Sequence, residues 1–197
     1  TPMNAIVGFS RLLEKNLQNE KKAKEYLEKI QVSSNLLLMI INQVLEMARI
    51  ESGTAVLRLK AEDMDALFHQ VNTVFEEDIR KKNLQYHADL DIRHHYAVCD
   101  QTKFLEIMLN IISNAIKYTP EGHSIYVEVH EAVSENPSKI RYIFSCEDTG
   151  IGMSEEYLPH IYEEFSRERS TTENKVPGTG LGLPIIKSMI ELMGGSI

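Results

Sequence analysis

The spacing of apolar residues between positions 23 and 48 constrains the fold more than any other feature of this chain. Small or apolar residues recur there at alternating steps of four and three, the heptad spacing of helices that pack side by side. They are Ala23, Leu27, Ile30, Ser34, Leu37, Ile41, Val44 and Ala48, widened by a parallel row of Tyr26, Ser33, Ile40 and Met47. A shorter helix is predicted before them, with Ile6, Ser10, Leu13 and Leu17 on one face. Residues 1–53 should therefore form a helical hairpin, connected through the polar sequence NLQNEKK.

A hairpin of this size encloses too little apolar surface to be stable alone. Two copies could bury their heptad rows against each other in a dimeric four-helix bundle, which is the arrangement we expect. The alternative is that the hairpin packs on the rest of its own chain.

The remainder of the chain, residues 54–197, has the pattern of an α+β domain. Strands are predicted in AVLRLK, LQYHADL, SIYVEVHEA and KIRYIFSCE. Helices are predicted after Asp63, with Leu67, Val71, Val74, Phe75 and Ile79 on one face, from Asp100 to Ala115, and from Leu183 to a stop at Gly194. Regular βαβ alternation is missing, so a helix layer on one face of a mixed sheet is expected.

Composition excludes several classes of function. A net charge of −8 argues against nonspecific nucleic-acid binding, and we expect no nucleic-acid partner. Cys99 and Cys146 lack metal-ligand spacing, which fits a reducing compartment. No apolar run is expected to reach the roughly 20 residues of a membrane span, and no signal peptide is visible. The chain begins at Thr1 without a methionine, which indicates a piece of a longer protein that could itself be anchored in a membrane.

Three glycines, Gly178, Gly180 and Gly182, stand two residues apart in PGTGLGLPIIKSM, directly before a predicted helix. Glycine lets a ligand approach the backbone closely, and the N–H groups of a helix N-terminus favour an anion such as phosphate. The pattern is neither the P-loop nor the dinucleotide fingerprint. It predicts a phosphate-binding loop, with a plain flexible loop as the alternative.

Polar residues on the helix that follows Asp100 recur at steps of four and three. Asn110, Asn114 and Lys117 should therefore form one row. Amide oxygens can ligate Mg²⁺ and lysine can meet a phosphate, although a solvated helix surface would look the same.

Two further segments carry groups suited to a nucleotide. In EDTGIGM, Asp148 ends a predicted strand before Gly150 and Gly152, so its carboxylate could accept a hydrogen bond from an exocyclic amine such as that of adenine. An ordinary acidic turn is the alternative. In IYEEFSRER, Tyr162 and Phe165 should be packing anchors, and Arg167 could reach a terminal phosphate.

Taken together, these segments resemble a bacterial two-component sensor histidine kinase. LNIISNAIKYTP is similar to the N box of that family, EDTGIGM to the G1 box, IYEEFSR to the F box and PGTGLGL to the G2 box, in the family's order. TPMNAIVGFSRLL is similar to the residues that follow the phosphoacceptor histidine, in a form frequent in hybrid kinases. The resemblance implies a dimerisation and phosphotransfer hairpin over residues 1–53 and an α/β sandwich ATP-binding domain of the Bergerat (GHKL) type over residues 54–197.

By position, the resemblance also implies roles for individual residues. Asn114 would hold Mg²⁺, Asn110 would help to place the phosphates, Lys117 would touch phosphate, and Tyr118 would lie against adenine or ribose. Asp148 would bind the adenine amine in a pocket shaped by Gly150 and Gly152, and Arg167 would stabilise charge on the transferred phosphoryl group. The lid hinge and further phosphate contacts would come from Gly178, Thr179, Gly180, Leu181 and Gly182.

Two departures from the family pattern stand at the ends of the chain. The acceptor histidine should lie four residues before Thr1, which would itself occupy the phosphatase-assisting position. GGSI normally begins the last strands of the ATP domain, so we expect a domain that lacks them. The resemblance implies a cytoplasmic homodimeric core that uses ATP and Mg²⁺, phosphorylates the histidine and serves a response-regulator receiver domain, within a parent that could reach the cell membrane.

Two other functions are compatible with the same sequence features. Related ATPases place a glutamate four residues before the magnesium-binding asparagine, where this chain has Asn110, and an amide cannot act as a general base. A non-catalytic dimeric scaffold, or pseudokinase, is the second alternative.

Overall fold

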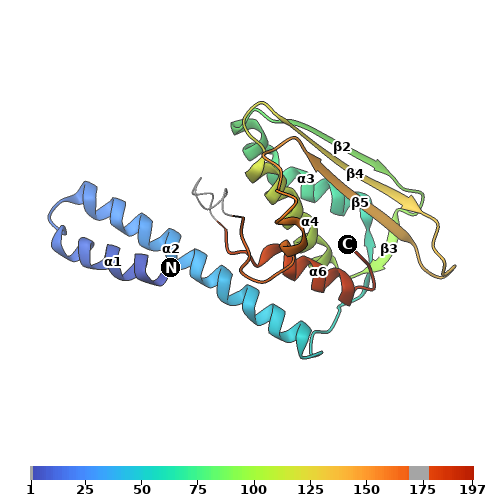
Figure 1. Ribbon diagram of the computed structural model, residues 1–197, viewed down its shortest axis with the longest axis horizontal. Helices are drawn as coiled ribbons and strands as arrows, with labels where there is room; N and C mark the ends of the chain where they lie inside the picture. Colours follow the sequence, from blue (N-terminus) through green and yellow to red (C-terminus); the bar gives the residue numbers. More distant parts are fainter. Residues whose placement is uncertain (1, 169–177) are drawn as a thin grey trace. The chain divides into compact units, whose positions relative to one another are not determined.

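The computed structural model describes residues 2–168 and 178–197. The chain consists of two compact units, Thr1–Thr54 and Ala55–Ile197. Helix α1 (Pro2–Lys15) and helix α2 (Glu20–Glu51) form the first unit (Figure 1). The connection is shorter than NLQNEKK, because Asn19 already caps α2 by accepting a hydrogen bond from Lys22 N at 3.1 Å. Leu17 consequently lies in the turn, where it is 66% exposed, and not on the face of α1.

Helix α1 covers only part of the apolar stripe of α2. The rings of Phe9 and Tyr26 stack with centroids 6.3 Å apart, which turns the Tyr26 side of α2 toward α1. Other members of the heptad row stay exposed, with exposed fractions of 50% for Leu27, 44% for Ile41 and 43% for Val44. Within the first unit, α1 therefore leaves an apolar strip of α2 uncovered.

Helix α2 also corrects one expectation from the sequence. An 18-residue window within Glu20–Glu51 has a mean hydropathy of 1.2, so by length and composition this helix could cross a membrane. One helix of this kind is weak evidence for a span, because core helices of soluble proteins and signal sequences pass the same test. The window is apolar because residues off the heptad row, such as Leu38 and Met39, add to it.

The second unit contains two small sheets. Strands β1 (Lys60–Asp63) and β3 (Tyr96–Cys99) form an antiparallel pair. Strands β2 (Gln85–Asp91), β4 (Ser124–Ala132) and β5 (Arg141–Asp148) form a sheet in that order, in which β2 and β4 are parallel and β4 and β5 antiparallel. This confirms the expected mixed sheet.

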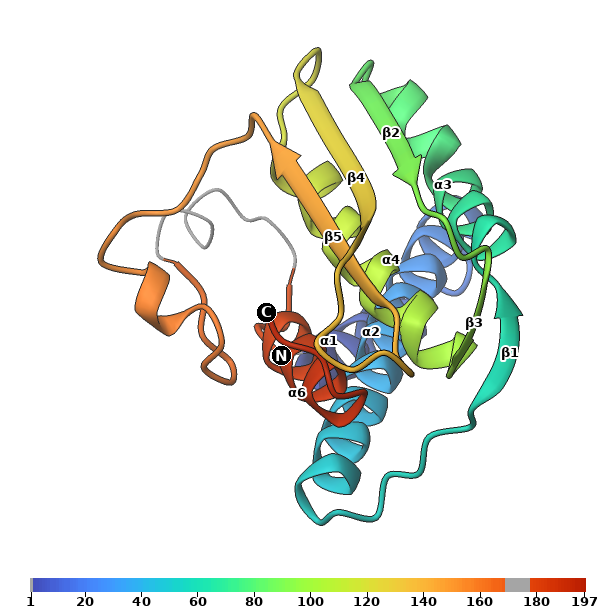
Figure 2. The ribbon, with the colours of Figure 1, turned by 90° about the vertical axis from the view of Figure 1, so that its right-hand side faces the viewer.

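Helices α3 (Met64–Lys81) and α4 (Gln101–Tyr118) lie together on one face of the three-stranded sheet (Figure 2). The core between them takes residues from all three layers, including Phe68 and Val71 of α3, Met108 and Ile112 of α4, and Val127 of β4. Asp63 and Asp100 cap the two helices as predicted, by accepting from Ala66 N and Lys103 N at 3.1 Å in each case. Helix α6 (Gly182–Leu192) packs against α4, and a short 3₁₀ helix covers Leu158–His160.

Two local predictions were wrong, and one strand was not predicted. AVLRLK does not pair as a strand over most of its length; β1 begins only at Lys60, and Arg58 N donates to Asp100 Oδ2 at 2.8 Å instead. Strand β3 is four residues long, too short for its alternation to stand out in the sequence. Val74 is 55% exposed, because the buried face of α3 runs through Leu67, Val71 and Phe75.

Candidate functional site

The polar row on α4 forms the floor of the candidate site. Asn110, Asn114 and Lys117 are all half-buried, on the helix that the cap at Asp100 begins. Asn110 Nδ2 donates to Glu106 O at 2.8 Å, which orients the amide. Lys117 Nζ donates to the Tyr118 hydroxyl at 3.1 Å and lies 4.6 Å from the Tyr118 ring centroid. The row is therefore partly enclosed and not a fully solvated helix surface.

The glycine loop lies along this row. A Cβ atom at Gly178 would stand 2.9 Å from Lys117 Nζ and 3.9 Å from both the Tyr118 hydroxyl and Arg167 Nε. At the other end of the loop, a Cβ atom at Gly182 would stand 3.7 Å from Asn110 Oδ1. The backbone of the loop thus lies beside the Asn110 amide and the two cations that the sequence predicted for phosphate.

A second contact joins the glycine loop to the segment before it. Phe165 N donates to Gly180 O at 3.1 Å. Gly180 has a φ of +75°, and a Cβ atom there would lie 2.7 Å from the backbone carbon of Phe165. Phe165 itself has a φ of 59°, which is rare for an aromatic residue, so both sides of this contact adopt backbone conformations that a bulkier or stiffer sequence would resist.

The turn after β5 contacts the last turn of α4, which also carries Lys117. Gly150 N donates to Asp148 Oδ1 at 2.9 Å, and Ile151 N donates to the Tyr118 carbonyl at 3.2 Å. A Cβ atom at Gly150 would stand 2.5 Å from Asp148 Oδ1 and 2.6 Å from Tyr118 O, so only glycine fits. The exposed Asp148 carboxylate is thereby held beside the last turn of α4.

The structure brings most of the predicted residues together, but not all in the predicted way. Leu181 is 2% exposed, so its side chain belongs to the core, and its N–H donates to Thr179 Oγ1 at 3.2 Å. Gly152 has a φ of +66°, and no described residue other than its chain neighbours lies within 4 Å of where its Cβ atom would stand, so it shapes the turn. Thr1 lies outside the described residues.

The arrangement suits a nucleotide triphosphate. Lys117 and Arg167 supply positive charge beside a loop whose missing side chains leave its backbone accessible, and Asp148 can accept from an amine near the same last turn of α4. Among the described residues, no group of three or more His, Cys, Asp or Glu side chains could hold a metal ion. A magnesium ion here would need amide oxygens together with phosphate oxygens, a combination that Mg²⁺ accepts.

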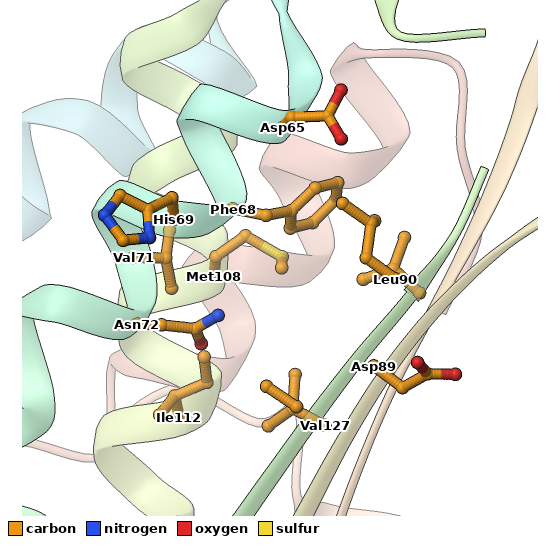
Figure 3. A pocket seen from close by; sticks show the side chains of 12 residues that line it. Asp65, Phe68, His69, Val71, Asn72, Asp89, Leu90, Met108, Ile112 and Val127 are labelled. Atoms are coloured by element: carbon orange, nitrogen blue, oxygen red, sulfur yellow. The ribbon is translucent and has the colours of Figure 1, made fainter. Parts of the chain in front are cut away.

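A cavity of about 220 Å³ lies elsewhere, between α3 and strand β2 (Figure 3). Phe68, Met108 and Ile112 point into it, and the Asn72 amide at its edge accepts from the Tyr86 hydroxyl at 2.7 Å. None of its lining residues belongs to the candidate site, so this cavity is a separate feature.

Comparison with known proteins assigns a family to each part of the chain. Residues 1–53 match the His Kinase A (phospho-acceptor) domain, and residues 99–197 match the Histidine kinase-, DNA gyrase B-, and HSP90-like ATPase family. The sensor histidine kinase GacS of Pseudomonas protegens is 33% identical over 201 residues, which cover 100% of this chain and 21% of GacS. The chain spans 21% to 27% of the length of the first curated relatives it matches.

Solved structures agree with this assignment. Full-length ShkA in complex with AMPPNP superimposes with a TM-score of 0.72 at 25% identity, over 98% of this chain and 39% of ShkA. Histidine kinase ThkA in complex with response regulator protein TrrA has a TM-score of 0.71 at 24% identity, over 99% of this chain and 52% of the matched chain, and supports the fold.

Proposed function

Because this chain belongs to the sensor histidine kinases, we propose that it is a catalytic core that binds Mg²⁺-ATP and transfers the γ-phosphoryl group to a histidine encoded upstream of residue 1. The transfer forms a bond from an imidazole nitrogen to the γ-phosphorus and breaks the bond from that phosphorus to the bridging oxygen, with ADP leaving. Domains over residues 1–53 and 54–197 would provide the acceptor and the ATP site.

One observation carries the proposal. The glycine loop, the cations of Lys117 and Arg167, and the turn that holds the Asp148 carboxylate all lie beside the last turn of α4. Lys117 and Arg167 both lie beside the backbone at Gly178, where they would neutralise phosphate charge. Asn114 would ligate Mg²⁺, and Asn110, already oriented by Glu106 O, would position a phosphate or a metal-bound water. Tyr118 would lie against the base, and Asp148 would accept from its amine.

Asn110 also favours transfer over hydrolysis. Its amide cannot take a proton from water at neutral pH, whereas a positioned imidazole needs no such base in order to attack phosphorus. We expect the full-length protein to form phosphohistidine from Mg²⁺-ATP while its steady-state hydrolysis stays below about 1 s⁻¹, the low end of typical enzyme turnover.

The test combines a calorimetric titration of Mg²⁺-ATP with an assay for acid-labile phosphate on the protein. Absence of nucleotide binding would leave a dimeric scaffold. Binding with fast hydrolysis and no phosphohistidine would indicate an ATPase instead.

We also propose that the first unit dimerises through the uncovered strip of α2. Replacing both Ile41 and Val44 by glutamate should weaken the dimer at least about 100-fold, because each copy would bring two charges into an apolar seam. Sedimentation equilibrium measures the shift. Val32, which is 68% exposed but off the heptad row, supplies the control: Val32→Glu should leave the dimer intact. A double variant that stays dimeric would place the interface elsewhere.

The partner and the location follow from the same proposal. A response-regulator receiver domain would accept the phosphoryl group, as the ThkA complex with TrrA suggests by analogy. Since ATP and such regulators are cytoplasmic, this core would act there, whatever anchors the parent protein.

A further inference from the structure

A single lysine ties the end of α4 to the end of α3. Lys82 is the C-cap residue of α3, and its ammonium donates to three carbonyls at the end of α4. The distances from Nζ are 2.6 Å to Ile116 O, 3.2 Å to Lys117 O and 2.9 Å to Thr119 O. The last carbonyls of a helix have no partner within the helix, so these groups need donors from outside it.

The number of donors on Lys82 equals the number of acceptors around it. An ammonium carries three N–H donors, and three acceptors meet it here. It also places positive charge at the negative end of the α4 dipole, in a half-buried position where solvent screens little. The Lys82 backbone joins as well, since its carbonyl accepts from Gly122 N at 3.2 Å. Both the final turn of α4 and the loop after it are therefore held by this residue.

That same turn carries the part of the site that faces the base and the phosphates. Lys117 and Tyr118 project from it, and the Tyr118 carbonyl accepts from Ile151 N beside Gly150. A shift of this turn of α4 would displace both Lys117, the proposed phosphate ligand, and the Tyr118 carbonyl that contacts the turn at Gly150. We infer that Lys82 is a positioning residue for nucleotide binding, an inference that rests on the proposed function.

The neighbouring lysine provides a matched control. Lys81 has the same charge and a side chain that is 64% exposed, and it pairs with Glu77 at 2.8 Å on the surface of α3. Lys81→Met removes a charge one residue away without touching α4. Lys82→Arg keeps the charge, but a planar guanidinium cannot place its donors on the same three carbonyls as a tetrahedral ammonium.

The experiment measures Mg²⁺-ATP affinity by calorimetry and amide hydrogen exchange by NMR in the full-length protein and these variants. Lys82→Met should bind Mg²⁺-ATP about tenfold more weakly than wild type, with Lys82→Arg in between and Lys81→Met unchanged. The Thr119 amide, which donates to Ala115 O at 3.0 Å, should lose about tenfold protection in Lys82→Met, while the Met108 amide in the middle of α4 keeps its protection.

Other outcomes overturn the inference. Equal affinity in Lys82→Met and Lys81→Met would do so while leaving the proposed function standing, even if Thr119 became less protected. Equal loss of protection at Thr119 and Met108 would indicate general destabilisation. Wild-type protein that does not bind Mg²⁺-ATP would remove both proposals. If Lys82→Met does not fold, Lys82→Arg decides: wild-type affinity with unchanged exchange at Thr119 contradicts the role.

Discussion

Replacing Asn114 by alanine is expected to abolish magnesium-dependent nucleotide binding. Asn114 lies on the half-buried polar row of α4, between Asn110 and Lys117, and in the proposed site it would supply an uncharged amide oxygen to the metal. Carboxylate and histidine clusters that could take over are missing from the described residues. With no protein oxygen to replace it, we expect affinity for Mg²⁺-ATP to fall at least about 100-fold, more than the loss usually seen when an outer-shell partner of a metal ligand is removed.

The measurement is a pair of titrations, one with magnesium and one with EDTA. In wild type, magnesium should strengthen binding; in Asn114→Ala, the two titrations should coincide. Ser113→Ala is the matched control, because Ser113 is the exposed neighbour on the same helix. Asn114→Asp should retain magnesium dependence, since a carboxylate is also a magnesium ligand. If Asn114→Ala still responds to magnesium as wild type does, the metal is held by other groups and the assignment of the polar row is wrong.

The elements that the sequence predicted well are those whose signals are local. Asp63 and Asp100 predict where their helices begin, because a capping carboxylate accepts a hydrogen bond from the N–H group three residues later. The heptad row of α2 and the alternation in β4 are equally local. Strand β3 depends instead on pairing with β1, which is more than thirty residues earlier, and four residues cannot reveal that partner.

The site divides in the same way. Residue types and spacing predicted Asn110, Asn114, Lys117, Asp148 and the glycine loop as site residues, because each type has a definite chemistry. They could not show why particular glycines are needed. Gly180 is fixed by the backbone of Phe165 and Gly150 by the carbonyl of Tyr118, contacts between segments far apart in the chain. Lys82 was missed for the same reason: a lysine in a polar turn has no pattern, and only the fold brings it to α4.

Replacing Asp148, the proposed ligand of the adenine amine, is expected to have the second large effect on ATP affinity. Asp148 Oδ1 already accepts from Gly150 N, which orients the carboxylate and leaves its other oxygen able to accept from the amine of adenine. Guanine has a carbonyl oxygen at the equivalent ring position, which a carboxylate repels. Asp148→Ala should therefore weaken ATP binding by about 10- to 100-fold, the value of a hydrogen bond to a charged group, and leave GTP binding unchanged or slightly improved.

Competition titrations of ATP against GTP test this directly. Glu147→Ala is the control, because Glu147 is the exposed carboxylate next to Asp148 on β5 and points to the other side of the sheet. Asp148→Asn adds a sharper comparison. Its neutral amide oxygen can still accept from adenine, but more weakly than a carboxylate, while its NH₂ can donate to the guanine carbonyl. ATP affinity should therefore fall and GTP affinity rise, so that the preference for ATP over GTP becomes smaller. A variant lacking the carboxylate that still prefers ATP as strongly as wild type would mean that another group reads the base. The turn at Gly150 would then serve only to brace the end of α4.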